Sequence, residues 1–174
     1  MFLALCTLAS AGELAERHAY ERAVAAATRE VRIYDGWYTA LLLRGTRVDD
    51  PLRRAQAARL AETTNGASPG PVTPEGPVVV LTAGGQWKDE LRFSADGSTP
   101  WTITLYAGET ACAAPASLVV TKRPNAADHL LYPHLTDWDK LIQVTWPADA
   151  CGGAEPDRLV LSSGRGRGEL RWGE

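Results

Sequence analysis

A proline-rich stretch near the middle of the chain constrains its fold more than any other feature. Residues 67–77 contain four prolines and two glycines. Proline cannot continue a helix or donate a hydrogen bond to a sheet, so this composition is typical of a linker. It divides the chain into residues 12–66 and residues 78–174, and the pattern of hydrophobic residues differs between the two parts.

The part before the linker predicts helices. Over residues 13–34, apolar side chains recur every three or four positions, as on one face of a helix: Tyr20, Ala23, Val24, Ala27, Val31 and Tyr34. The apolar run 37–43 is too short to separate helix from strand, and we favour a helix because helices flank it. Asp50 before Pro51 is typical of an N-cap followed by a first helical residue, and predicts a helix to about Glu62.

The part after the linker predicts strands. Short runs rich in β-branched and aromatic residues alternate with turn residues, at positions 78–82, 101–106, 117–121, 141–146, 158–162 and 169–172, with a shorter candidate at 91–93. Such spacing is typical of an antiparallel sandwich. The predicted fold is therefore α+β: an N-terminal helical segment followed by an immunoglobulin-like β-sandwich.

The first eleven residues suggest export. They form an apolar run that ends in Ala9-Ser10-Ala11, the small-x-small pattern of a signal-peptidase site, although no Lys or Arg precedes the run. Two alternatives remain: the apolar first turn of a packed helix, or a lipobox in which Cys6 carries the lipid anchor. The run is shorter than the roughly 20 apolar residues that cross a bilayer, so no transmembrane span is predicted.

The cysteine count agrees with export. Removal of Cys6 with a signal peptide leaves one pair, Cys112 and Cys151, and both lie in stretches rich in Ala, Gly or Pro. A disulfide between them predicts a periplasmic or secreted protein, because such bonds persist in oxidising compartments. The alternative is two free thiols in a cytosolic protein.

Composition and charge exclude some functions. The net charge is −3 and neither half of the chain is polycationic. A nucleic-acid binder needs a basic stripe, so we predict no nucleic-acid partner. No sequence motif indicates a cofactor.

The densest group of polar residues lies at positions 128–139. His129, His134 and Asp137 are the candidate catalytic residues of a metal-dependent or carboxylate hydrolase. The histidines are five residues apart, which fits neither a helical nor a strand pair of ligands, so no metal site is assigned. The competing interpretation is a crossover loop whose aspartates cap turns.

Four further residues are candidate contact residues. Trp87 and Trp138 lie outside the strand patterns, and two coplanar exposed rings would form a carbohydrate platform. Arg165 and Arg167 alternate with glycines at 164–168, where they could meet a phosphate or a glycan. The alternative is a flexible hairpin turn, since strand-like runs flank the segment.

Several short motifs resemble a loose group of uncharacterised exported proteins and lipoproteins of GC-rich Gram-negative bacteria. The motifs are 33–36 (Ile-Tyr-Asp-Gly), 98–101 (Ser-Thr-Pro-Trp), Tyr132-Pro133, Trp146-Pro147 and 168–172 (Gly-Glu-Leu-Arg-Trp). The resemblance implies localisation in the cell envelope, and it assigns neither an activity nor a site. Together with the residues above, it favours a non-enzymatic envelope module that contacts another protein or a surface component.

Overall fold

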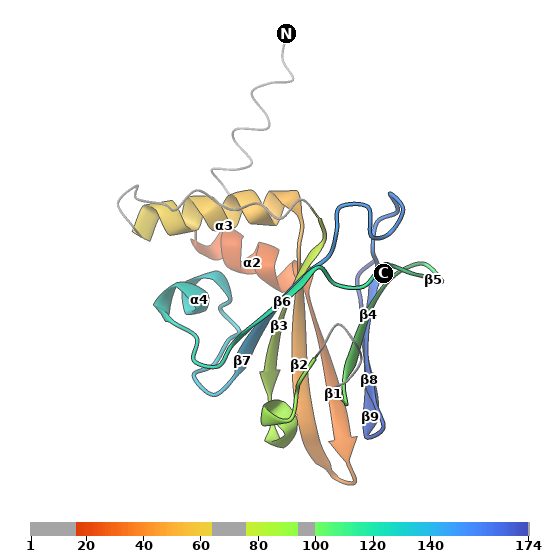
Figure 1. Ribbon diagram of the computed structural model, residues 1–174. Coiled ribbons are helices and arrows are strands. Elements are labelled where there is room, and N and C mark those ends of the chain that lie inside the picture. Colours follow the sequence, from red (N-terminus) through yellow and green to blue (C-terminus); the bar gives the residue numbers. More distant parts are fainter. Residues whose placement is uncertain (1–16, 64–75, 94–99, 174) are drawn as a thin grey trace.

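Two antiparallel sheets face each other, and helices cover the outer face of one of them (Figure 1). The computed structural model describes residues 17–63, 76–93 and 100–173. The predicted signal segment 1–11, with Cys6, and nearly all of the predicted linker 67–77 lie outside the described residues. The described elements are α2 (Arg17–Ala27), β1 (Thr28–Asp35), β2 (Tyr38–Val48), α3 (Asp50–Thr63), β3 (Val78–Gly84), η1 (Gln86–Asp89), β4 (Thr102–Ala107), β5 (Thr110–Ala111), β6 (Ser117–Thr121), α4 (Ala126–Leu131), β7 (Lys140–Thr145), β8 (Arg158–Ser163) and β9 (Gly166–Arg171).

The helical prediction for the first part of the chain is correct at its two ends and wrong between them. The helix predicted to reach Tyr34 ends at Ala27, and both 28–35 and 38–48 are strands. Val31 and Ile33 alternate with charged residues, as in a half-exposed strand. The two strands form a hairpin whose turn contains Gly36, with a φ of 58° that glycine adopts without steric cost.

The second predicted helix is present, and its N-cap lies one residue earlier than predicted. Asp50 is its first residue, and Asp49 is the cap, because the Asp49 carboxylate accepts a hydrogen bond of 2.8 Å from the Leu52 amide. The six strands predicted after the linker are all confirmed, with ends that shift by a few residues. The shorter candidate at 91–93 forms only an isolated bridge between Phe93 and Trp101.

The first sheet has the strand order β1-β2-β3-β7-β6 and the second has β5-β4-β8-β9. Because β2 pairs with β3 along its length, the two parts of the chain share one sheet. β3 is buried at every position, and its side chains alternate between two cores. Val79 and Leu81 pack between the sheets, whereas Val78 and Val80 pack towards the helices. The fold therefore has three layers.

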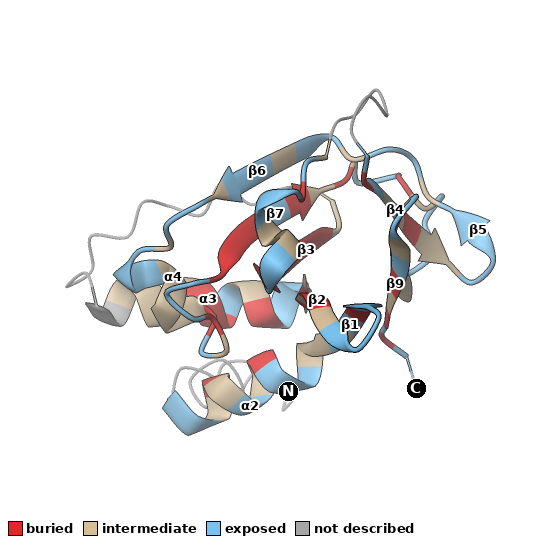
Figure 2. Ribbon diagram, turned by 90° about the horizontal axis from the view of Figure 1, so that it is seen from below, coloured by how far each residue is buried: buried red, intermediate tan, exposed pale blue. Residues whose placement is uncertain are grey.

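The helix layer has a small core of its own. Tyr20 and Val24 of α2 pack against Leu52 and Ala55 of α3, and Figure 2 shows buried positions on the sides of these helices that face the sheet. The Tyr20 hydroxyl donates to the Leu131 carbonyl of α4 at 2.7 Å. One hydrogen bond thus connects α2 to α4.

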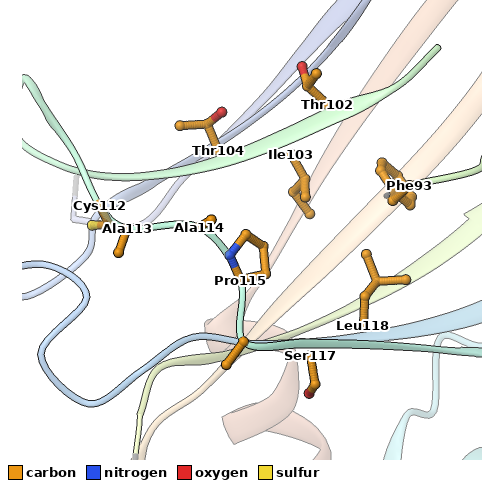
Figure 3. Close-up of a pocket in the computed structure, with 11 residues that line it drawn as sticks. Phe93, Thr102, Ile103, Thr104, Cys112, Ala113, Ala114, Pro115, Ser117 and Leu118 are labelled. Carbon is orange, nitrogen blue, oxygen red and sulfur yellow. The ribbon is translucent and has the colours of Figure 1, made fainter. Parts of the chain in front are cut away.

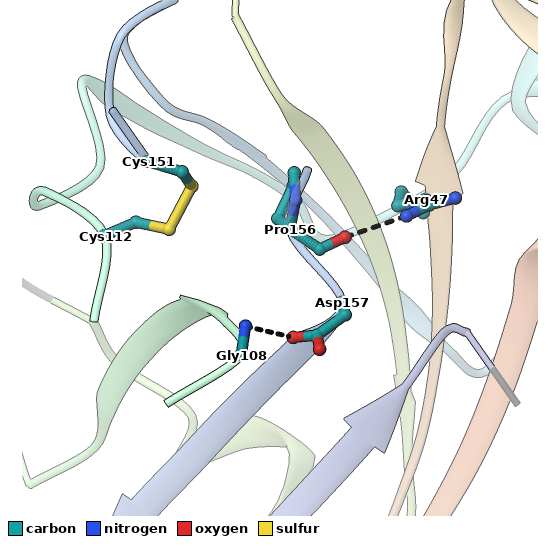
Figure 4. The surroundings of a disulfide bond; sticks show 6 residues. All are labelled: Arg47, Gly108, Cys112, Cys151, Pro156 and Asp157. Carbon is teal, nitrogen blue, oxygen red and sulfur yellow. Dashed lines mark hydrogen bonds between the residues drawn. A yellow bond between two sulfur atoms is a disulfide. The ribbon is translucent and has the colours of Figure 1, made fainter. Parts of the chain in front are cut away.

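A disulfide joins Cys112, just after β5, to Cys151, in the loop after β7 (Figure 4). The bond spans 39 positions of the sequence. Next to it, the Ala113 amide donates to the Ala150 carbonyl at 2.8 Å. The disulfide therefore joins the segment between β5 and β6 to the loop between β7 and β8.

Replacing both cysteines by serine should lower the free energy of unfolding by about 3 to 4 kcal/mol, because the unfolded chain regains the entropy of an open loop of this length. Urea unfolding of the wild type and of Cys112→Ser/Cys151→Ser measures the difference. A reductant should lower the stability of the wild type and leave the double variant unchanged. Equal stability of the oxidised wild type and the double variant would contradict the prediction.

Candidate functional site

Two of the aspartates in the 128–139 cluster stabilise the local backbone. Asn125 and Asp128 form a capping box at the start of α4: the Asn125 side chain accepts from the Asp128 amide, and the Asp128 carboxylate accepts from the Asn125 amide at 2.8 Å. Asp139 accepts from the Thr136 amide at 3.0 Å. Both carboxylates accept hydrogen bonds from nearby backbone amides, so they cap turns as the crossover-loop interpretation predicted.

Only two of the three candidate catalytic residues contact one another. His129 Nε2 lies 3.3 Å from Asp137 Oδ1, and the Asp137 side chain is 88 % exposed. His134 Nε2 is buried without a hydrogen-bond partner, so it bonds to neither residue. Among residues 17–63, 76–93 and 100–173, no three or more His, Cys, Asp or Glu side chains are grouped so as to hold a metal ion. The geometry gives a hydrolase centre no support.

His134 belongs instead to the packing between the sheet and α4. Its ring meets the Tyr132 ring edge-on, with 6.3 Å between centroids. The Arg44 guanidinium donates to the His134 carbonyl at 3.3 Å. Burial, and then the charge of Arg44, lower the pKa of His134 from 6.5 to about 4, which keeps the imidazole neutral. Burial likewise raises the pKa of Tyr132 to about 12.

The candidate contact residues lie at one end of the molecule, around η1 and the β8–β9 turn (Figure 1). The Arg165 guanidinium lies over the Trp87 ring at 5.4 Å and pairs with Glu90. Trp87 is half-buried against the core, whereas Trp138 is 80 % exposed. Trp87 and Trp138 therefore do not form the pair of open, exposed rings that a carbohydrate platform of these two residues requires.

The glycines around the two arginines are needed for packing. A Cβ at Gly166 would lie 2.7 Å from Ile33 of β1, and one at Gly168 would lie 3.2 Å from Val31. The absence of side chains lets β9 approach β1 and close that edge of the sandwich. Arg167 is exposed, with its guanidinium 3.5 Å from Glu169. The segment forms the tight β8–β9 hairpin, as the turn interpretation predicted.

Sequence reasoning found the exposed Trp138 but missed three other highly exposed aromatic residues, Trp37 among them, which is the most exposed of the described aromatics. The tip of the β1–β2 hairpin carries Tyr34, Trp37 and Tyr38, which are 57, 98 and 73 % exposed. The pair Asp35-Gly36 between two apolar runs is a strong hairpin signal and could have placed these side chains at a tip. Tyr38 pairs across the hairpin with Asp35, and Tyr34 with Thr39, so the two tyrosines point to opposite faces of the hairpin.

These residues share one end of the molecule with Trp138. Figure 1 shows the β1–β2 hairpin projecting past η1 and the β8–β9 turn, and Figure 2 shows the exposed tip from below. The Lys88 ammonium donates to the Trp138 carbonyl, which holds the Trp138 backbone beside η1. We call Tyr34, Trp37, Tyr38 and Trp138 the aromatic end.

No protein-family model, no curated protein and no solved structure matches this chain. In the part of the chain that the structure describes, no helix has both the length and the apolar character needed to cross a membrane.

Acid should destabilise the fold through His134. Its pKa is about 4 in the folded protein, below the ordinary value of 6.5 for histidine, so the unfolded chain binds more protons between these two pH values. The contribution of neutral His134 to the free energy of unfolding is complete above about pH 6.5 and is lost as the pH falls towards 4. Because solvent reaches part of the half-buried ring and screens its charge, we expect a loss of about 1 kcal/mol between pH 7 and pH 5.

The variant His134→Phe keeps an aromatic ring against Tyr132 and removes the titrating group. Its free energy of unfolding should therefore fall by about 1 kcal/mol less than that of the wild type over the same pH interval. Urea unfolding at several pH values measures both curves. Parallel curves would show that His134 does not carry the acid sensitivity.

Proposed function

We propose that this protein is an exported, non-enzymatic binding module of the cell envelope that contacts another protein or a surface component through its aromatic end. The observation that carries the proposal is the 98 % exposure of Trp37 at the tip of a projecting hairpin. A disulfide and an N-terminal run ending in Ala9-Ser10-Ala11 support a periplasmic or secreted location. An acylated Cys6 would attach the same module to a membrane.

Exposed aromatic side chains at this density favour an interface. Trp and Tyr are enriched at the centres of protein interfaces, where a few residues supply most of the binding energy. Trp37 and Tyr38 bury little apolar surface in the described fold, because most of each side chain faces solvent. A contact with another molecule would remove that apolar surface from water.

Two polar pairs lie beside η1, at the same end of the molecule as the aromatic end. Lys140 lies 2.9 Å from Asp89, and Arg165 pairs with Glu90. A ring of polar groups around an apolar centre is the usual arrangement of a protein interface. The pairing of Arg165 with Glu90 and its position over Trp87 favour a role in this rim over binding of a free phosphate or glycan.

The arrangement of the sheets supports an immunoglobulin-like type for the sandwich. The two antiparallel sheets share one core and a disulfide. Helices α2, α3 and α4 on the outer face are additions to such a sandwich. Loops at one end of a sandwich commonly carry its binding residues, which agrees with the position of the aromatic end.

A photo-crosslinking amino acid at position 37 tests the proposal in cells that export the protein. We expect a discrete adduct whose partner mass spectrometry identifies. Purified protein carrying Trp37→Ser should then bind that partner about 30-fold more weakly, because loss of a central tryptophan typically costs about 2 kcal/mol. Its free energy of unfolding should change by less than about 0.5 kcal/mol, since the side chain is exposed.

The matched control places the same crosslinker at Arg54, an exposed position on α3 at the other end of the molecule. This position should give no adduct with the same partner. Equal adducts from positions 37 and 54, or unchanged affinity of Trp37→Ser, would refute the aromatic end as the contact surface.

A further inference from the structure

The tip of the β1–β2 hairpin emerges abruptly from the buried part of the sandwich. Residues 34–38 are all exposed, whereas Ala40 and Leu41 of β2 are 1 and 0 % exposed. Trp37 lies three residues before Ala40, which corresponds to up to about 10 Å of extended chain. The tip therefore projects from the molecule by a length of this order, as Figure 1 shows.

Aromatic side chains surround this tip instead of forming a patch on one side of it. Tyr34 and Tyr38 belong to adjacent cross-strand pairs, so they point to opposite faces of the hairpin. Trp37 lies in the turn between them and is 98 % exposed. A flat protein surface that covered one face of the hairpin would leave the tyrosine of the other face in water. Burial of all three rings requires a contact that surrounds the tip.

A membrane surface surrounds an inserted tip on every side and needs no shaped pocket. Trp and Tyr are enriched at membrane–water interfaces, because each ring is apolar while its N–H or O–H stays hydrated. Elements that bind in this interface reach about 5 to 10 Å into it, which matches the projection of the tip. The residue types and the length of the tip therefore both fit a lipid surface.

The charges near the tip favour a zwitterionic lipid over an anionic one. From residue 33 to residue 43, the only charged residue is Asp35. Three cations of the flanking elements are paired with carboxylates: Arg32 with Glu30, Lys140 with Asp89, and Arg165 with Glu90. Anionic lipids attract clusters of unpaired Lys and Arg, and they would repel Asp35. The tip therefore suits a surface without net charge.

We propose that the tip of the β1–β2 hairpin inserts into the interface of a zwitterionic phospholipid membrane. Tyr34, Trp37 and Tyr38 leave water together, while Asp35 stays among the hydrated headgroups. The inference rests on the proposed contact through the aromatic end and names the partner of that contact as a lipid surface.

Flotation of the oxidised protein with phosphatidylcholine vesicles tests the inference. We expect the wild type to float with the vesicles at millimolar lipid concentrations. Addition of phosphatidylglycerol to the vesicles, or of salt to the buffer, should change the partition coefficient by less than about 3-fold, because the charges near the tip are balanced.

Substitutions around the tip test whether the contact surrounds it. Trp37→Ser should lower the partition coefficient at least about 10-fold, because interfacial binding scales with the apolar area that leaves water. Tyr34→Ser and Tyr38→Ser should each lower it at least about 3-fold, since a membrane contacts both faces of the hairpin.

Two control variants change apolar surface away from the tip. Val119→Ser removes a 56 % exposed side chain of β6. Ala114→Trp adds a ring at the wall of the groove of about 420 Å³ between β4 and β6, which Ile103 and Leu118 also line (Figure 3). Both variants should float as the wild type does, because neither position belongs to the hairpin. Loss of flotation in Ala114→Trp would assign the lipid to the groove.

Quenching by brominated phosphatidylcholine reports on Trp37 directly. The wild type should lose tryptophan fluorescence on binding, because the inserted indole comes within reach of the bromine atoms. Trp37→Phe keeps an aromatic ring and should still float with the vesicles. It should lose at least about half of the quenching, since the other tryptophans lie outside the inserted tip.

Three results would overturn the inference. The first is no flotation of the wild type with phosphatidylcholine, or flotation with anionic vesicles alone. The second is unchanged binding of Tyr34→Ser or Tyr38→Ser, because it indicates a contact on one face of the hairpin. The third is a crosslink from position 37 to a protein and to no phospholipid, which keeps the aromatic end as the contact surface and assigns it to a protein. Absence of any adduct at position 37 would refute the proposed function as well.

Discussion

The burial of β3 on both faces is the constraint on which the other layers depend. Val79, Leu81 and Ala83 reach the core between the sheets, and Val78 and Val80 reach the core under the helices. A strand covered on both sides reads as a continuous apolar run, because neither face meets water. β3 also pairs with β2 and β7, so the strands before and after it in the sequence join one sheet around it.

The strands after residue 77 could be predicted because turn residues separate them and their side chains suit a pleated surface. The region 28–48 could not, since Val24, Ala27 and Val31 fit a helical spacing while Val31 and Ile33 fit a strand spacing. Pairing with β3 decides between the two, because it places Leu41 and Leu43 in the core. That contact depends on tertiary structure, which local periodicity does not contain.

The candidate site was predictable only where a residue's role is local. Asp128 and Asp139 cap turns within three residues of themselves, as their types suggest. The separation of His134 from the His129–Asp137 pair depends on Arg44 and Tyr132, and Arg44 lies far away in the sequence. The exposure of Trp37 likewise depends on a hairpin, whereas the sequence analysis interpreted both 13–34 and 37–43 as helical.

The two edges of the sandwich are closed by different contacts. At one edge, Gly166 and Gly168 let β9 approach β1 so closely that side chains of β1 fill the space. At the other edge, β5 pairs with β4 at Tyr106 and Ala107, and the disulfide just after β5 joins the adjacent segment to the loop after β7.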